Sequence, residues 1–332
     1  MPSPTAGSAT SGPTSCAIFS AGPPRATCAA TTSTAPRGGD VGLLVARTRP
    51  ELQAALDPAR EACRRIGLVP TMGALHAGHD ALIGRTRTMS DVSVVSIFVN
   101  PTQFGADEDF GVYPRSFQAD LDRCAAEGVD LVFAPDVATM YPDGAGGVSV
   151  EPGPLGGVFE GVTRPTHFRG VLTVVAKLLH LVAPDVAAFG EKDYQQLVLV
   201  RQMVNSLQFD VEVLGVPIVR QADGLALSSR NSFLDDEDRR HALMLSRALT
   251  AGIDAAPRGV DAVLAAARDV LASAAGAVDY VALTDPYLGE PRLGQEARLL
   301  VAARVSTVRL IDNTSLRLGL PAGASSGEVV GP

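Results

Sequence analysis

The sequence is poor in aromatic residues, in lysine and in positive charge. Aromatic residues make up 5% of its 332 residues and tryptophan is absent, so a core has to be built from Val, Leu and Ala. The formal net charge of −8 argues against a broad phosphate-binding surface for DNA or RNA, although a small basic pocket remains compatible with it. Only Lys177 and Lys192 are lysines among the 28 basic residues, so each needs its own explanation.

Cysteines and long apolar runs are also scarce. The four cysteines form no C-x-x-C pair, and they are Cys16, Cys28, Cys63 and Cys124. This usage favours a reduced, cytoplasmic protein over a disulfide framework. The longest apolar candidate, residues 171–182, is interrupted by Lys177 and His180 and is shorter than the roughly 18 residues that a membrane span needs. We therefore expect neither a membrane nor a nucleic acid as a partner.

The two ends of the chain differ from the rest. Residues 1–39 are rich in Ser, Thr, Ala, Pro and Gly and contain no acidic residue, which predicts a disordered extension. A transit peptide shares this composition, but two arginines and no amphipathic face favour it less. A start codon assigned too far upstream would give the same pattern. Residues 319–332 are small and polar and are expected to form a flexible tail.

Between residues 40 and 218, apolar strand-like runs alternate with helical patterns. Strands are expected at 41–46, 67–73, 91–100, 129–135, 184–190 and 210–219. Helices are expected at 50–66, 76–89, 117–128, 171–182 and 193–207. Such alternation predicts an α/β fold, a Rossmann-like doubly wound parallel sheet.

The pattern changes over residues 219–318. Two helices, at 236–253 and 260–275, precede strands at 278–285, 297–305 and 307–312. This order predicts a smaller α+β C-terminal domain, acting as a lid and joined through residues 220–235.

The stretch "PTMGALHAGH", residues 70–79, carries two of the five histidines at the start of an expected helix. Ligands bind beyond the carboxyl ends of parallel strands, and a helix N-terminus attracts phosphate. His76 and His79 therefore suit a nucleotide that is attacked at phosphorus. A metal pair and an ordinary exposed helix start are the alternatives. The sequence contains neither G-x-x-x-x-G-K-[ST] nor a G-x-G-x-x-G after a strand, which leaves the P-loop and dinucleotide interpretations unsupported.

This stretch resembles the H-x-G-H motif of the adenylyl-transferring superfamily that includes class I aminoacyl-tRNA synthetases. The longer string is similar to the pantothenate synthetase (pantoate–β-alanine ligase) family. Three further blocks match that family in order, across residues 41–317: "SIFVNPTQF", then "RPTHFRGVLTVVAKLL" with "FGEKDYQQLVLVRQMV", and "DGLALSSRNSFL". The resemblance implies that ATP activates (R)-pantoate as pantoyl adenylate with loss of pyrophosphate. β-Alanine then displaces AMP to form pantothenate, on the route to coenzyme A, and the family implies a homodimer.

The resemblance also assigns roles. The expected ATP-binding residues are Met72, Gly73, Ala74, Leu75, His76, Ala77, Gly78, His79, Gly190, Glu191, Lys192, Asp193, Val219, Leu227, Ser228, Ser229 and Arg230. Those expected to act in catalysis are His76, His79 (the proton donor), Lys192, Ser228, Ser229 and Arg230. Asn100, Gln103 and Gln196 are expected to bind pantoate, and Gln103 also β-alanine. Mg²⁺ would accompany ATP, with Asp120 as its candidate ligand.

Lys192 stands out in a chain that otherwise uses arginine. A compact ammonium can follow a phosphate during transfer, whereas a planar guanidinium demands fixed geometry. Lys177 and His180 lie mid-helix and are expected to extend toward solvent. Glu160, Arg164 and His167 either cover the site or belong to a structural loop, and the sequence does not decide between these.

The sequence departs from the family at three places. Leu227 replaces a methionine, an apolar change that should be tolerated. Thr102 stands where methionine is frequent and is expected to alter the wall of the pantoate pocket. Ala119 stands where a carboxylate is common. Two rival functions remain: another adenylyl or cytidylyl transferase with H-x-G-H, and a nucleotide-binding regulatory protein without activity.

Overall fold

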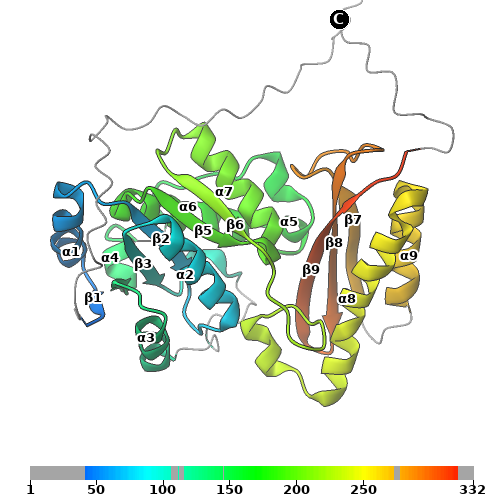
Figure 1. Cartoon of the computed structure of the whole chain (residues 1–332), viewed down its shortest axis with the longest axis horizontal. Helices are drawn as coiled ribbons and strands as arrows, with labels where there is room; N and C mark the ends of the chain where they lie inside the picture. The colour runs from blue at the N-terminus through cyan, green and yellow to red at the C-terminus, as the bar shows by residue number, and fades with distance from the viewer. Residues whose placement is uncertain (1–41, 106–110, 112–115, 145, 273–276, 321–332) are drawn as a thin grey trace, which may run out of the picture.

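The computed structural model describes residues 42–105, 111, 116–144, 146–272 and 277–320 (Figure 1). The predicted extension at 1–39 and most of the predicted tail lie outside these ranges. Gly319, which lies inside them, donates its N–H to the carbonyl oxygen of Ala256 at 3.0 Å. No helix in the described ranges combines the length and the apolar character needed to span a membrane.

A six-stranded parallel sheet forms the first unit. Its strands are β1 (Leu44–Ala46), β2 (Ile66–Thr71), β3 (Val92–Ile97), β4 (Leu131–Phe133), β5 (Val186–Gly190) and β6 (Glu212–Val216). The spatial order is β1-β4-β3-β2-β5-β6, and each neighbouring pair is parallel. The order reverses between β2 and β5, so the predicted doubly wound sheet is confirmed, and a ligand is expected beyond the carboxyl ends of these strands.

Helices cover both faces of this sheet. The helices of this part of the chain are α1 (Arg49–Glu61), α2 (Ala77–Met89), α3 (Phe117–Ala126), α4 (Val137–Met140), α5 (Glu160–Thr163), α6 (His167–Val182) and α7 (Tyr194–Ser206). Successive strand residues enter different apolar clusters: Leu68 packs with α1, α6 and α7, whereas Val69 packs with α2 and α3. Because side chains alternate along a strand, continuous apolar runs place one layer of helices on each face.

The predicted helix at 50–66 is wrong at its end. Helix α1 stops at Glu61, Cys63 has a left-handed φ of 52°, and Ile66 opens β2 with 2% of its surface exposed. A left-handed residue cannot continue an α-helix, so the chain turns directly into the sheet.

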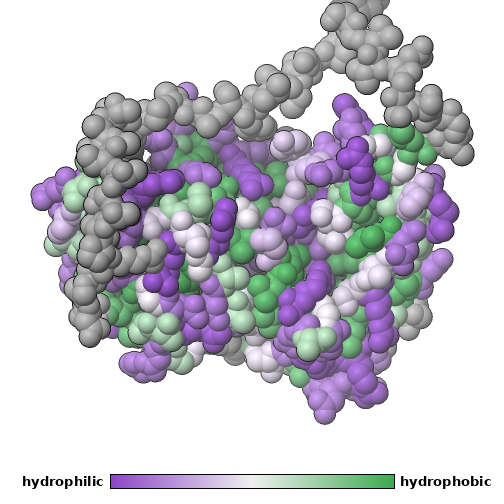
Figure 2. All heavy atoms as spheres, in the orientation of Figure 1, coloured by the Kyte–Doolittle hydropathy of each residue, from purple (hydrophilic) through white to green (hydrophobic). Residues whose placement is uncertain are grey.

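A three-stranded antiparallel sheet forms the second unit, and the predicted α+β class of this part of the chain is confirmed. It contains β7 (Ala277–Thr284), β8 (Glu296–Val305) and β9 (Val308–Arg317) in that spatial order. Helices α8 (Asp236–Ala255) and α9 (Val260–Ala272) pack on one face through an apolar cluster that includes Leu249, Val263 and Leu299. Over α8, at the lower right of Figure 2, the surface is mainly hydrophilic, as expected for an amphipathic helix.

Strand β9 is longer than the sequence predicts. The expected strand ended at Asp312, but pairing with β8 continues to Arg317 opposite Glu296. The extra residues begin with a polar run whose strand character comes from this pairing. The division of the chain at residues 218 and 219 into two domains stays a prediction. Short 3₁₀ turns lie between these elements: η1 (Pro101–Gln103), η3 (Pro154–Gly157), η4 (Glu191–Asp193), η5 (Ser229–Phe233) and η6 (Ala256–Arg258).

Candidate active site

The two histidines after β2 both cap α2 and face a cavity. His76 is the N-cap residue, and its Nδ1 accepts a hydrogen bond from the Gly78 N–H at 3.1 Å. His79 Nδ1 in turn accepts the His76 N–H at 3.2 Å, and the two rings lie 4.2 Å apart between centroids. A ring that accepts a backbone N–H at Nδ1 carries its proton on Nε2 when neutral. Each histidine therefore keeps an Nε2–H donor for a ligand.

Both imidazoles are held in the neutral form. Burial lowers the pKa of His79 to about 3, with the neighbouring His76 as a further cause. Burial also lowers the pKa of His76, assisted by the charges of Lys192 and Arg123. At neutral pH the pair therefore offers hydrogen bonds to phosphate oxygens without carrying charge of its own.

The backbone between β2 and α2 is fixed from behind by Asp120. Its carboxylate accepts the N–H groups of Ala74 at 3.0 Å and Leu75 at 2.8 Å, and it is 3% exposed. Gly73 has φ = 81°, and a Cβ there would come within 2.9 Å of the Asp120 carboxylate. Asp120 thus shapes the turn, and both of its oxygens serve backbone donors. We do not propose it as a metal ligand.

The loop after β3 places Gln103 at the cavity and Asn100 behind it. Asn100 is 0% exposed: its Nδ2 donates to Gln103 Oε1 and its Oδ1 accepts the hydroxyl of Tyr141. Gln103 Nε2 contacts Met72 Sδ at 2.9 Å. Asn100 therefore orients Gln103 and lies outside the lining of the cavity, and a direct contact of Asn100 with pantoate stays a prediction from the sequence. Thr102 faces the same buried oxygen of Asn100, at 3.0 Å, and not the cavity.

Helix α6 holds this loop in place. A Cβ at Gly170 would lie 2.2 Å from the Thr102 carbonyl oxygen, so only glycine permits the close approach. His167 Nδ1 donates to the carbonyl oxygen of Gln103 at 2.9 Å, and its Nε2 lies 3.1 Å from a guanidinium nitrogen of Arg164. Both residues line the cavity, so the loop that the sequence left undecided contributes two side chains to the site.

Turn η4 brings Lys192 to the opposite wall. Its Nζ lies 3.8 Å from the Asp193 carboxylate, and the lysine side chain is 20% exposed. Gln196, one turn further along α7, lines the same cavity. Lys177 on α6 differs, since its Nζ lies 5.3 Å from the centre of the Tyr141 ring, and His180 is exposed.

The loop before α8 supplies the third wall. Ser228 is the N-cap of η5, and its Oγ accepts the N–H of Arg230 at 3.3 Å. Leu227, Ser228, Ser229 and Arg230 all line the cavity. Leu227 therefore contributes an apolar side chain to this wall of the cavity.

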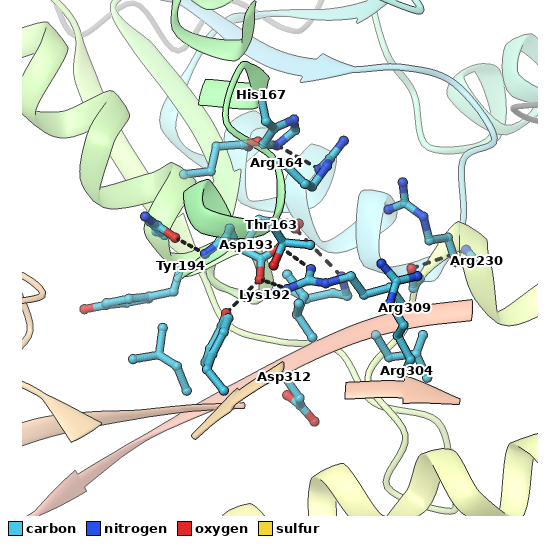
Figure 3. Close-up of a pocket in the computed structure, with 18 of the residues that line it drawn as sticks. Thr163, Arg164, His167, Lys192, Asp193, Tyr194, Arg230, Arg304, Arg309 and Asp312 are labelled. Carbon is cyan, nitrogen blue, oxygen red and sulfur yellow. Dashed lines mark hydrogen bonds and ion pairs between the residues drawn. The ribbon is translucent and has the colours of Figure 1, made fainter. Parts of the chain in front are cut away.

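These segments meet around one cavity of about 240 Å³. The predicted residues that line it are Met72, His76, Gly78, His79, Gln103, Gly190, Lys192, Asp193, Gln196, Val219, Leu227, Ser228, Ser229 and Arg230. The predicted residues outside its lining are Gly73, Ala74, Leu75, Ala77, Asn100, Asp120 and Glu191. A second cavity of about 730 Å³ shares Arg164, Lys192 and Arg230 with it, and Figure 3 shows these side chains around it.

The second cavity is bordered by a buried ion-pair network that sequence reasoning missed. Arg309 on β9 donates to both carboxylate oxygens of Glu160, at 2.5 and 2.8 Å, and to Asp279 at 2.5 Å. Burial opposes the charge of Arg309, but the hydrogen bond and charge of Glu160 raise its pKa. Tyr280 donates to Glu160 at 2.8 Å. Glu160 therefore joins α5 to the C-terminal sheet and does not act as a cover. Glu160 and Arg309 are 149 residues apart, so no local sequence pattern could indicate that they form a pair.

The arrangement supports chemistry at phosphate. Neutral imidazole donors, one ammonium, two guanidinium groups and serine hydroxyls reach the cavity from four different segments, while uncharged amides line it near Met72 and α7. Preorganised donors of this kind stabilise charge that develops during group transfer. Together with the doubly wound sheet, these donors define the class of protein, an α/β nucleotidyl-transfer enzyme.

The chain belongs to the pantoate–β-alanine ligase family. The sequence model described as "Pantoate-beta-alanine ligase" matches residues 44–315. Pantothenate synthetase of Nocardia farcinica is 56% identical over 259 residues, covering 78% of this chain and 81% of the relative. That of Saccharopolyspora erythraea is 56% identical and covers 84% and 93%, respectively.

Solved structures of this family are also similar to the chain. Pantothenate synthetase from Thermus thermophilus superposes with a TM-score of 0.76 at 48% identity, covering 82% of this chain and 98% of that one. Pantoate-beta-alanine ligase from Francisella tularensis, complexed with beta-gamma ATP and beta-alanine, gives a TM-score of 0.69 at 34% identity, covering 82% and 97%.

Proposed function

We propose that this chain condenses (R)-pantoate with β-alanine to form pantothenate, with conversion of ATP to AMP and pyrophosphate. The observation that carries the proposal is the single cavity on which phosphate-binding donors and neutral amides converge. Membership in the family supports the reaction, and the relative crystallised with beta-gamma ATP and beta-alanine supports the substrates.

The first step forms the acyl adenylate. A carboxylate oxygen of pantoate attacks the α-phosphorus of ATP, and the bond to the bridging oxygen breaks as pyrophosphate leaves. We assign His76 and His79 to the triphosphate, each donating from Nε2, with His79 as the inner, more buried donor. Because both rings are neutral, this role is hydrogen-bond donation at a developing charge and needs no proton transfer.

Lys192 and the Ser228–Arg230 segment complete the phosphate contacts. The Lys192 ammonium can move with the transferring phosphate, whereas Arg230 and the two serine hydroxyls suit the departing pyrophosphate. Lys192 and Arg230 lie on separate elements that border both cavities. The larger cavity then offers pyrophosphate a route out of the site.

The second step forms the amide. The amine of β-alanine attacks the carbonyl carbon of the adenylate, AMP leaves, and the amine loses a proton. Gln103 and Gln196 line the cavity as uncharged donors and acceptors. We assign pantoate to them, with Gln103 also near β-alanine. Uncharged partners leave the nucleophilic carboxylate of pantoate reactive, whereas a salt bridge would stabilise it in the ground state.

Magnesium is proposed to enter with ATP. Within the described residues no group of three or more His, Cys, Asp or Glu side chains could hold a metal, and Asp193 is the one carboxylate among the described residues that line the smaller cavity. This donor set fits Mg²⁺ held mainly by the substrate's phosphates, where it would neutralise their charge. The homodimer and the cytoplasmic location stay predictions from the sequence.

The test is release of AMP and pyrophosphate from ATP with (R)-pantoate, with and without β-alanine. We expect steady AMP release only with both substrates, and a loss of at least about 100-fold in His79→Ala. A nucleotidyl transferase for a different acid would release AMP with that acid and not with pantoate. Tight ATP binding without turnover would support the regulatory alternative instead.

A further inference from the structure

The turn that carries Lys192 is held by a strand more than a hundred residues away in the sequence. Asn313 on β9 donates from Nδ2 to the carbonyl oxygens of Glu191 and Lys192, both at 2.9 Å and 121 or 122 residues distant. Asn313 is 2% exposed. Since η4 is a single 3₁₀ turn between β5 and α7, its carbonyl groups depend on partners from outside the turn.

Arg298 on β8 fixes the orientation of this amide. Its Nε donates to Asn313 Oδ1 at 2.7 Å, and its Nη2 donates to Glu191 Oε2 at 3.1 Å. The guanidinium carbon lies 4.0 Å from the centre of the Tyr194 ring, at the start of α7. With its oxygen turned to Arg298, Asn313 can present only its amide NH₂ group to η4. The pair therefore holds the turn in one defined geometry.

The neighbouring residue on β9 holds the other cationic element. Asp312 is 3% exposed and accepts two hydrogen bonds from Arg220, at 2.7 and 2.9 Å. Arg220 begins the loop that leads to the segment Ser228–Arg230. Of two adjacent residues on one strand, Asn313 thus contacts the turn that carries Lys192, and Asp312 contacts the start of the loop that leads to Arg230.

We propose that Asn313, oriented by Arg298, is a positioning residue for Lys192. It sets the distance between the lysine ammonium and the phosphates held by the Ser228–Arg230 segment, without touching substrate itself. This inference rests on the proposed function, in which Lys192 acts on the transferring phosphate. Positioning matters because a displacement of about 1 Å can lower a rate about 100-fold.

A double-mutant cycle tests the inference in the full chain. The variants are Asn313→Ala, Lys192→Ala and their combination, and the assay is exchange of labelled pyrophosphate into ATP in the presence of (R)-pantoate. We expect Asn313→Ala to lower the exchange kcat between about 10- and 100-fold, with less than about threefold change in the KM for pantoate. In the Lys192→Ala background the same change should cost less than about threefold, because the positioned group is gone.

Two further variants separate positioning from folding. Asn313→Asp keeps the volume and the bond to Arg298 but has no N–H to donate, so its kcat should fall as far as that of Asn313→Ala. Ser315→Ala alters an exposed residue of the same strand and should retain full exchange. If Asn313→Ala does not fold, as judged by circular dichroism, the cycle is run with Asn313→Asp.

The outcomes are distinct. Equal losses from the Asn313 change in both backgrounds would overturn the inference, since the residue would then act without Lys192. Exchange at the wild-type rate in Asn313→Asp would overturn it as well. Failure of the wild-type chain to exchange pyrophosphate in a pantoate-dependent manner would refute the proposed function itself.

Discussion

The histidine pair is expected to work in its neutral form, and this has a measurable consequence for stability. An unfolded histidine titrates near pH 6.5, whereas burial lowers the pKa of His79 to about 3 in the folded chain. Below pH 6.5 the unfolded state therefore binds a proton that the folded state does not bind, so folding stability falls as the pH falls. The loss amounts to about 1.4 kcal/mol per pH unit while only the unfolded form is protonated.

The assay is urea denaturation of wild type and His79→Asn at pH 5.5 and pH 4.5. Asparagine can still accept the His76 N–H but does not titrate. Between the two pH values the wild type should lose about 1 kcal/mol more than the variant. His180→Asn, at an exposed position on α6, controls for the loss of one histidine and should follow the wild type. If the wild type and His79→Asn lose the same free energy of unfolding between the two pH values, the conclusion that His79 is a buried, neutral imidazole is refuted.

The protonation state of the two histidines also determines the expected pH dependence of adenylate formation. If neutral Nε2–H donors are what the site needs, single-turnover adenylate formation should not accelerate as the pH is lowered from 8 to 6. A protonated imidazole acting as a general acid would instead raise the rate up to about tenfold per pH unit above its pKa. A rise of that size would show that the charged form is the active one.

Three further outcomes are expected from the described contacts. Gly170→Ala should lower the free energy of unfolding by about 1–3 kcal/mol, because its Cβ meets a main-chain carbonyl at 2.2 Å; Gly84→Ala, with open space around it, should raise it by up to about 1 kcal/mol in the same urea titration. Arg309→Met should cost about 3–5 kcal/mol by leaving the Glu160 charge buried, and adding Glu160→Gln should restore part of this in thermal unfolding. Gln103→Ala should raise the KM for pantoate at least about tenfold, with a smaller change in the KM for ATP, in steady-state kinetics.

The regular elements of the fold follow from local patterns, with exceptions that have physical causes. Strand β3 and helix α6 were located from their predominantly apolar runs, although α6 begins at His167, four residues before the predicted start. Helix α1 was predicted too long because the left-handed turn at Cys63 leaves no clear trace in composition. Strand β9 was predicted too short because its polar second half is a strand only through its pairing with β8.

The site divides in a similar way. The predicted side chains that face the cavity lie just beyond the ends of strands β2, β3 and β5 or in the loop before α8, where short motifs preserve their spacing. Asn100 and Gln103 were both assigned to pantoate because each offers uncharged hydrogen bonds from the loop after an apolar strand. In the structure they face different directions: Asn100 is saturated by buried partners and Gln103 lines the cavity. Sequence spacing places both on the loop, and only packing against α6 decides which one is exposed to a ligand.

The residues that hold the site in place come from a different part of the chain than the residues that form it. Arg298, Asp312 and Asn313 are buried polar side chains of the C-terminal sheet, and their partners lie between 92 and 122 residues earlier in the chain. A buried polar group is costly unless it is hydrogen-bonded, so each of these side chains is stable only when η4 or the loop from Arg220 is docked against β9. Docking of the C-terminal sheet and the placement of Lys192 are therefore linked through Asn313. A variant that loosens the sheet should lose adenylation before it loses its fold.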